Sequence, residues 1–464
     1  MYFEKFHSDM NEQIKNKELF ENSKKYAYEY MDNARLMDVS PSIESLSMLE
    51  RLSEPMPESP CPPLEIINLL HEIGSRNSVA STGGKYFGFV TGGATPVALA
   101  AKWLADVWDQ NTALYVISPI AAKLEDLCEK WIVELLGLPA NTAAGFVSGS
   151  STAIICGLAA ARNTILARQG WDVAEKGLFG APPIRVVIGK QAHSSVWKAL
   201  SMIGLGKENA EIIPVNSQGR MIADSLPPLD SNTLLIIQAG NVNGGAFDPI
   251  DAICDIAHDA GAWVHIDGAF GLWAAACENT KHLTKGIEKA DSWSADAHKT
   301  LNVPYDCGIV LCKDRSAFVK AMQASGSYIQ YSEDRDGMLY TPEMSRRARS
   351  IELWATLKYL GKSGIDEMIS QLCELTKRFA AGLDKNGFII ENTCFNQIVM
   401  RCGNAEKTKE LMKRIQSSGK CWCGGAMWND EPVIRVSVSS WQTTIQDVDE
   451  CMELFVALRD NIEA

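Results

Sequence analysis

The sequence predicts an α/β protein built on a mostly parallel β-sheet. Short apolar runs, each long enough for one strand, alternate with helix-length segments between about residues 85 and 315. The runs are apolar throughout, which is typical of parallel strands that are buried on both faces. Ligands of such sheets bind beyond the carboxyl ends of the strands.

Composition narrows the class of protein. With 464 residues, 46% of them hydrophobic, the chain can bury a large core and divide into two or three domains. A net charge of -13 without a Lys/Arg-rich block argues against nucleic acid or an anionic membrane as a partner. The 13 cysteines form no CxxC pair, so we expect reduced thiols and no metal site. Without a signal segment or a membrane-length apolar run, we expect a cytoplasmic protein.

Residues 1–84 are predicted to form an N-terminal helical arm. Residues 10–36 are charge-rich and helix-prone, and a proline-rich stretch separates them from an amphipathic helix that begins near Leu64. The apolar faces of these helices have no counterpart within the arm. We therefore expect the arm to pack on a partner subunit.

Residues 85–345 are predicted to form the large domain. Its expected helices span residues 120–137, 151–168, 194–203 and 250–260, and its expected strands span 145–147, 184–188, 233–237, 263–266 and 308–311. A further short buried strand edge is predicted within residues 291–300, just before Lys299. The polar stretch 313–345 is expected to be a long loop of the kind that often serves as a lid.

Residues 346–464 are predicted to form a small C-terminal α+β domain. Its expected helices span residues 346–361, 364–385, 404–418 and 444–461. Residues 433–439 alternate strictly between apolar and polar types, which predicts a strand. Ile434, Val436 and Val438 would share one face of that strand, and Arg435 would lie on the other.

One lysine and one aspartate predict the reactive centre. Lys299 follows a predicted strand edge, comes directly after His298 and precedes an apolar run. A lone lysine is most often a surface residue, but desolvation in this setting would free the amine. Asp267 ends another predicted strand, where a lone aspartate most often caps a turn. The pair predicts pyridoxal 5'-phosphate (PLP), which needs an amine for a Schiff base and a carboxylate to keep its ring nitrogen protonated.

Two further segments fit that cofactor. Residues 145–153 join a strand to a helix through small hydroxyl residues, so Ser150 and Ser151 are candidate phosphate donors, with a plain serine N-cap as the alternative. His193 follows the strand at 184–188 and therefore stands at the carboxyl edge of the sheet. A structural histidine is the alternative there, but next to a cofactor its imidazole could stack on the ring and transfer a proton.

Four segments, in order along the chain, resemble the group II PLP decarboxylases, which include the aromatic L-amino acid and glutamate decarboxylases. They are QAHSS with His193, HIDGAFG with Asp267, DAHK with Lys299, and SRRARS at 345–350. The likeness runs from about residue 85 to the C terminus and is closer to the aromatic branch. It implies PLP fold type I with a seven-stranded sheet, a homodimer with the active site at its interface, and loss of the α-carboxyl group as carbon dioxide.

The resemblance also implies a role for each matching residue. By this resemblance, Lys299 forms the Schiff base, Asp267 binds the pyridine nitrogen, His193 stacks on the ring and Ala269 packs beneath it. Ser150 and Ser151 match the phosphate-binding turn, and His298 matches the histidine that precedes the family's lysine. Tyr328 matches the tyrosine that protonates the substrate carbon, and Arg435 resembles an arginine that binds the substrate carboxylate in some members.

Two positions depart from the family pattern. Residues 240–243 read Gly-Asn-Val-Asn where many members have Gly-Thr-Thr near the phenolic oxygen of the cofactor, so Asn241 or Asn243 is expected to substitute. Asp296 stands where animal aromatic decarboxylases carry an asparagine near the phosphate. Because two anions repel at contact distance, we expect Asp296 to turn away or to bond to a backbone N–H.

We expect an aromatic substrate, of the tyrosine, tryptophan, phenylalanine or DOPA type. Phe87, Phe89 and Trp103 are the candidates for its apolar pocket, although Gly88 and Val90 make the match to the family's pocket only partial. Ser345 resembles a position where a serine accompanies phenolic substrates in plant relatives.

Three alternatives stay open. The first is a decarboxylase of an acidic or aliphatic amino acid. The second is an aldehyde synthase, against which Tyr328 argues, because aldehyde-forming members often carry phenylalanine there. The third is a non-catalytic scaffold, against which the joint presence of Lys299, Asp267 and His193 argues.

Overall fold

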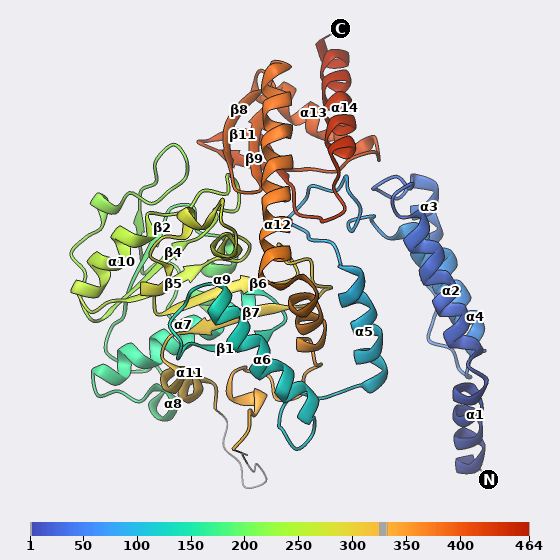
Figure 1. The fold of residues 1–464 in the computed structure, drawn as a ribbon, viewed down its shortest axis with the longest axis horizontal. Coiled ribbons are helices and arrows are strands. Elements are labelled where there is room, and N and C mark those ends of the chain that lie inside the picture. The colour runs from blue at the N-terminus through green and yellow to red at the C-terminus, as the bar shows by residue number, and fades with distance from the viewer. Residues whose placement is uncertain (1, 324–330, 332, 464) are drawn as a thin grey trace.

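The computed structural model describes residues 2–323, 331 and 333–463 and contains a large and a small β-sheet (Figure 1). The large sheet has seven strands in the order β1-β7-β6-β5-β4-β2-β3. Its strands are β1 (Ala143–Val147), β2 (Arg185–Gly189), β3 (Ala210–Ile213), β4 (Thr233–Gln238), β5 (Trp263–Asp267), β6 (Ser292–Asp296) and β7 (Gly308–Cys312). Strands β3 to β6 pair in parallel and only β7 runs antiparallel to its neighbours, so the predicted mostly parallel sheet is confirmed.

The apolar strands are buried on both faces of the sheet. Along β4, Leu234 and Ile236 belong to one apolar core, while Leu235 and Ile237 belong to the other. Helices cover both faces, as expected for such strands (Figure 1). The main helices of this part are α5 (Pro96–Trp108), α6 (Pro119–Leu135), α7 (Ser150–Arg168), α9 (Ser194–Met202) and α10 (Ile250–Asp259).

Two elements of the large domain differ from prediction. The edge strand β3 has a half-exposed pattern, so it lacks the apolar run by which the other strands are recognised. The stretch 313–345 is not a continuous loop, because it begins with helix α11 (Arg315–Met322). That helix is capped by Asp314, which accepts a hydrogen bond from the Ala317 N–H, and it is anchored by the buried Phe318.

The small sheet has the order β10-β11-β9-β8 and is antiparallel. Its strands are β8 (Ile389–Cys394), β9 (Gln397–Arg401), β10 (Gly424–Trp428) and β11 (Glu431–Ser437), packed with α13 (Ala405–Ser417) and α14 (Ile445–Glu463). Ile434, Val436 and Val438 lie in the core of this region, and Arg435 lies on the opposite face, as predicted.

One long helix, α12 (Ser350–Lys385), runs from the large sheet to the small one where two helices are predicted (Figure 1). Gly361 interrupts it with a φ of 58°, a conformation that side chains disfavour. The break therefore coincides with the predicted division between two helices.

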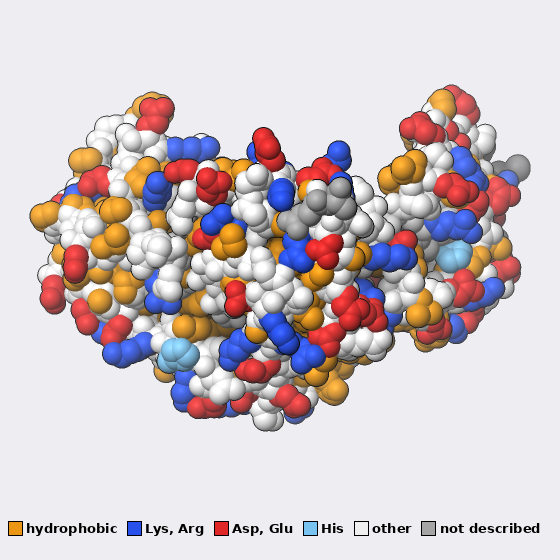
Figure 2. Space-filling model, turned by 90° about the horizontal axis from the view of Figure 1, so that it is seen from above, with side chains coloured by type: hydrophobic (Ala, Val, Ile, Leu, Met, Phe, Trp, Pro, Cys, Tyr) orange, Lys and Arg blue, Asp and Glu red, His pale blue; other side chains and the backbone are white. Residues whose placement is uncertain are grey.

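The arm comprises α1 (Tyr2–Asn16), α2 (Glu18–Asn33), α3 (Ile43–Ser47) and α4 (Pro63–Leu69) and projects from one side of the molecule (Figures 1 and 2). Its helices expose large apolar side chains, among them Phe6, Ile14 and Phe20. None of the thirteen cysteines, all within the described residues, forms a disulfide. Across the part of the chain that is described, no helix combines the length and apolarity that crossing a membrane requires.

Candidate active site

A cavity of about 650 Å³ opens beyond the carboxyl ends of β2, β4 and β5, where the small domain faces the large sheet. Seven of the sequence-predicted site residues line it: Phe89, His193, Asn243, Asp267, Ala269, Lys299 and Arg435. Other lining residues are not predicted from the sequence as site residues, among them Gln191, Gln238, Phe270 and Met427. Gln191 and Gln238 carry a signal that could have found them, since each lies at or just beyond a strand's carboxyl end.

Lys299 lies just past β6 and extends toward Asp296 at the end of that strand. Its Nζ is 3.2 Å from Asp296 Oδ2. The other carboxylate oxygen, Oδ1, accepts a hydrogen bond of 2.6 Å from the backbone N–H of Ser150, at the start of α7. The expectation that Asp296 bonds to a backbone N–H is therefore confirmed. Ser150 and Ser151 lie at this helix start and do not line the cavity.

His298 is held on three sides beside the lysine. Its Nδ1 accepts a hydrogen bond of 3.1 Å from the Cys307 N–H, so the neutral ring carries its proton on Nε2. Nε2 lies 3.6 Å from Asp296 Oδ1, and the ring packs at 4.5 Å against the ring of Tyr305. Burial lowers the pKa of His298, so its neutral form is favoured.

Asp267 is a buried carboxylate that lacks an ion-pair partner among the described residues. It accepts only long hydrogen bonds, of 3.3 Å from the Ala269 N–H and 3.4 Å from the Ser294 hydroxyl. Burial raises the pKa of Asp267, which means that the anion is costly in this environment. A protonated ring nitrogen in the cavity would supply the missing cation.

His193 has one ring nitrogen engaged and one left over. It is the N-cap of α9, and its Nδ1 contacts the Ser195 hydroxyl at 2.6 Å and accepts from the Ser195 N–H at 3.2 Å. Nε2 is thus left for a group in the cavity. Burial lowers the pKa of His193, which favours the neutral ring.

Arg435 is a buried guanidinium with spare donors. Its Nη1 donates to the Val242 carbonyl at 3.0 Å, while its Nε is buried without a hydrogen-bond partner. No carboxylate of the described residues pairs with it, and burial lowers its pKa. A buried cation of this kind is expensive unless an anion accompanies it.

The Asn-Val-Asn turn uses its first asparagine for its own structure. The Asn241 side chain accepts from the N–H groups of Asn243 and Gly244 and donates to Gln191 Oε1 at 2.7 Å. It is buried and does not line the cavity, so the suggestion that Asn241 substitutes for the family's threonine hydroxyl is not supported by this geometry. Asn243 is the asparagine that lines the cavity.

Only Phe89 of the three predicted aromatic pocket residues reaches the cavity. Phe89 and Val90 have φ values of 53° and 58°, a strained conformation for such side chains, and the Phe89 ring packs at 5.2 Å against Trp422. Phe87 is instead buried in the small-domain core. Trp103 stacks at 6.0 Å on Tyr28 of the arm and lines a different cavity.

Gly88 belongs to the same turn, and its lack of a side chain has a steric reason. A Cβ at this position would come within 2.1 Å of the Trp422 ring. The glycine that makes the family match partial is therefore required by the neighbouring tryptophan. Tyr328, the predicted proton donor, lies outside the described residues.

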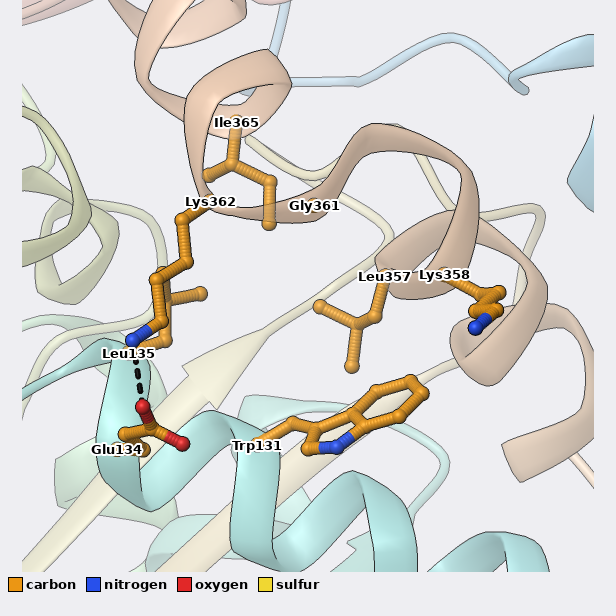
Figure 3. A pocket seen from close by; sticks show the side chains of 8 residues that line it. All are labelled: Trp131, Glu134, Leu135, Leu357, Lys358, Gly361, Lys362 and Ile365. Atoms are coloured by element: carbon orange, nitrogen blue, oxygen red, sulfur yellow. Dashed lines mark hydrogen bonds and ion pairs between the residues drawn. The ribbon is translucent and has the colours of Figure 1, made fainter.

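A second hollow, of about 280 Å³, lies between α6 and α12 and has a different character (Figure 3). Trp131 and Leu357 point into it beside the Gly361 break, and the Glu134 carboxylate pairs with Lys362 Nζ at 2.5 Å across one side. None of the predicted site residues lines it. Within the described ranges, no cluster of His, Cys, Asp or Glu side chains could hold a metal ion.

Comparison with known proteins gives a family match over most of the chain. The model of the pyridoxal-dependent decarboxylase conserved domain matches residues 48–401. Acidic amino acid decarboxylase from Mus musculus is 26% identical over 359 residues, which is 73% of this chain and 64% of the mouse protein. Aromatic-L-amino-acid decarboxylase from Bacillus atrophaeus is 25% identical over 94% of this chain and 93% of its own length.

A solved structure shares the fold. The structure of Oryza sativa TDC with PLP and tryptamine superposes with a TM-score of 0.88 at 21% identity, over 97% of this chain and 98% of the rice chain. At that identity the likeness concerns the fold, and it agrees with the predicted PLP fold type I architecture.

Proposed function

This chain belongs to the pyridoxal-dependent decarboxylase family, and from that premise we propose that it removes the α-carboxyl group of an aromatic L-amino acid to give the amine and carbon dioxide. PLP is the cofactor of this family. The relatives act on both acidic and aromatic amino acids, so the choice between these two classes has to come from the site.

The main observation that supports PLP as the ligand of this site is the state of Asp267. Among the described residues, the buried Asp267 carboxylate has no ion-pair partner, and it lines the same cavity as Lys299. We assign Lys299 to the cofactor's aldehyde and Asp267 to its ring nitrogen. We assign His193 and Ala269 to the two faces of the ring, and the start of α7 with Ser151 to its phosphate.

Bound PLP supplies an electron sink for the pair that remains on the substrate α-carbon when carbon dioxide leaves. The chain contributes position and charge. Asp267 would keep the ring nitrogen of the cofactor protonated, and Arg435 would hold the substrate carboxylate. His193, neutral and with Nε2 available, can accept or return a proton. We assign the final protonation of the α-carbon to Tyr328.

Arg435 is the main reason for proposing an aromatic rather than an acidic substrate. The described cations that line the cavity are Lys299, which the cofactor takes, His193, whose neutral form burial favours, and Arg435. If Arg435 binds the α-carboxylate, none of these three is left for a second carboxylate on the side chain. The remaining wall includes Phe89, Val90, Phe270 and Met427, which suits an uncharged ring.

A substrate panel tests the proposal. Purified protein loaded with PLP should release carbon dioxide and amine from tyrosine, tryptophan, phenylalanine or DOPA at least about 100-fold faster than from glutamate, aspartate or cysteine sulfinate, because an unpaired buried carboxylate costs several kcal/mol. Turnover of the acidic substrates alone would contradict it. Peroxide and ammonia released in step with carbon dioxide would instead identify an aldehyde synthase.

We also propose that the protein works as a homodimer. The arm and α5 expose apolar side chains, including Leu104 and Val107, around a cavity of about 780 Å³ lined by Tyr30, Leu99 and Trp103. Exposed apolar surface of this kind marks protein interfaces. Light scattering should give a mass of twice 50.8 kDa, and a single-chain mass at micromolar concentration would contradict the proposal.

A further inference from the structure

Asp296 is bound from both sides by groups of the candidate active site. Its side chain is buried, with Oδ2 at 3.2 Å from Lys299 Nζ and Oδ1 at 2.6 Å from the Ser150 N–H. His298 Nε2 stands 3.6 Å from Oδ1. The carboxylate therefore bridges the reactive lysine and the start of α7.

The start of α7 is shaped to receive this carboxylate. The helix has 19 residues, and its N-cap is Gly149, which has no side chain to cap the free N–H groups. A Cβ at Gly149 would lie 3.6 Å from Asp296 Oδ1 and 3.4 Å from the His298 ring, both ordinary contact distances, so this end of the helix lies directly against the two side chains. Asp296 thus supplies from β6 the anion that the helix start attracts.

The same helix start is where the cofactor's phosphate is assigned. A phosphate there would need the N–H groups at the start of α7, and the N–H of Ser150 is already taken by Asp296. The phosphate carries two negative charges close to a third one that is buried. Charges of equal sign repel strongly when they are shielded from water.

We propose that Asp296 competes with the cofactor's phosphate for the start of α7 and holds the Lys299 ammonium in place until PLP arrives. The inference rests on the proposed assignment of Lys299 and α7 to PLP. It makes Asp296 a positioning residue that weakens cofactor binding. An asparagine at this position would keep an oxygen for the Ser150 N–H without the charge.

Titration of cofactor-free protein tests the inference. Asp296→Asn should lower the Kd for PLP by at least about tenfold, because the charge that repels the phosphate is gone. Pyridoxal, which has the aldehyde but lacks the phosphate, should change its Kd by less than about threefold. Asp296→Ser, which also removes the charge, should shift PLP binding in the same direction.

The control is Asp314→Asn, which alters a capping carboxylate of α11 outside the site and should leave both Kd values unchanged. An unchanged or higher Kd for PLP in Asp296→Asn would overturn the inference. An equal gain for pyridoxal would also overturn it, because the effect would then act through the lysine alone. Borohydride reduction separates the two proposals, since pyridoxyl on a lysine other than Lys299 would refute the assignment of the site itself.

Discussion

Replacing Lys299 by alanine is expected to abolish turnover and covalent cofactor attachment together. Lys299 lies in the cavity that also contains Asp267 and His193, and among these three it alone offers a primary amine to an aldehyde. Without the amine, the cofactor is held only by non-covalent contacts and the product has no nucleophile to release it. We expect kcat to fall at least about 1,000-fold, as for other covalent nucleophiles.

The measurement is borohydride reduction of the PLP-loaded protein followed by peptide mapping. The unaltered chain should carry pyridoxyl on Lys299, and the alanine variant should carry none. Lys190→Ala is the matched control, because Lys190 also follows a strand of the large sheet but does not line the cavity. Turnover by Lys299→Ala within about tenfold of the unaltered chain would refute the assignment.

The large sheet was predictable because its signal is local. Strands β4, β5 and β7 are mainly apolar and buried at every position, so composition over five or six residues identifies them. Position at a strand's carboxyl end then groups His193, Asp267 and Lys299, since adjacent parallel strands end at the same edge. The structure places all three around one cavity.

The parts that could not be predicted depend on contacts between distant segments. A backbone N–H is the expected partner of Asp296, but the actual donor, Ser150, lies 146 positions away, and no local pattern identifies it. Phe87 and Phe89 are two residues apart, yet one is buried in the small domain and the other lines the cavity. Both residues contact Trp422, which is more than 300 positions further along the chain. The Trp422 carbonyl accepts a hydrogen bond from the Phe87 N–H, and its ring packs against the ring of Phe89.

The position of Arg435 could be predicted from the sequence only in part. Alternation of apolar and polar residues along 434–439 predicts which face of the strand the arginine occupies, and the structure agrees. That this face turns toward the large sheet follows only from the packing of the two domains. A buried guanidinium with an unpartnered Nε then becomes meaningful, because the cavity beside it also holds the lysine and the aspartate.

Asp267→Asn is the second substitution with a large expected effect. Asparagine has nearly the same shape but no charge, so it cannot keep the ring nitrogen of PLP protonated. The withdrawal of electrons from the substrate α-carbon should weaken, and kcat should fall at least about 100-fold, roughly 2.7 kcal/mol of transition-state stabilisation. Lys299 stays in place, so borohydride should still attach pyridoxyl to it.

This combination of retained attachment and lost turnover separates an electronic role from a structural one. Asp267→Glu keeps the charge and should retain more activity than Asp267→Asn. The matched control is Asp291→Asn. Asp291 directly precedes β6 and accepts a hydrogen bond from the Val264 N–H, near the start of β5, and burial likewise raises its pKa. Because Asp291 is outside the cavity, its loss should cost stability and leave kcat unchanged. Equal losses of kcat in the two asparagine variants would mean that Asp267 acts only through the fold.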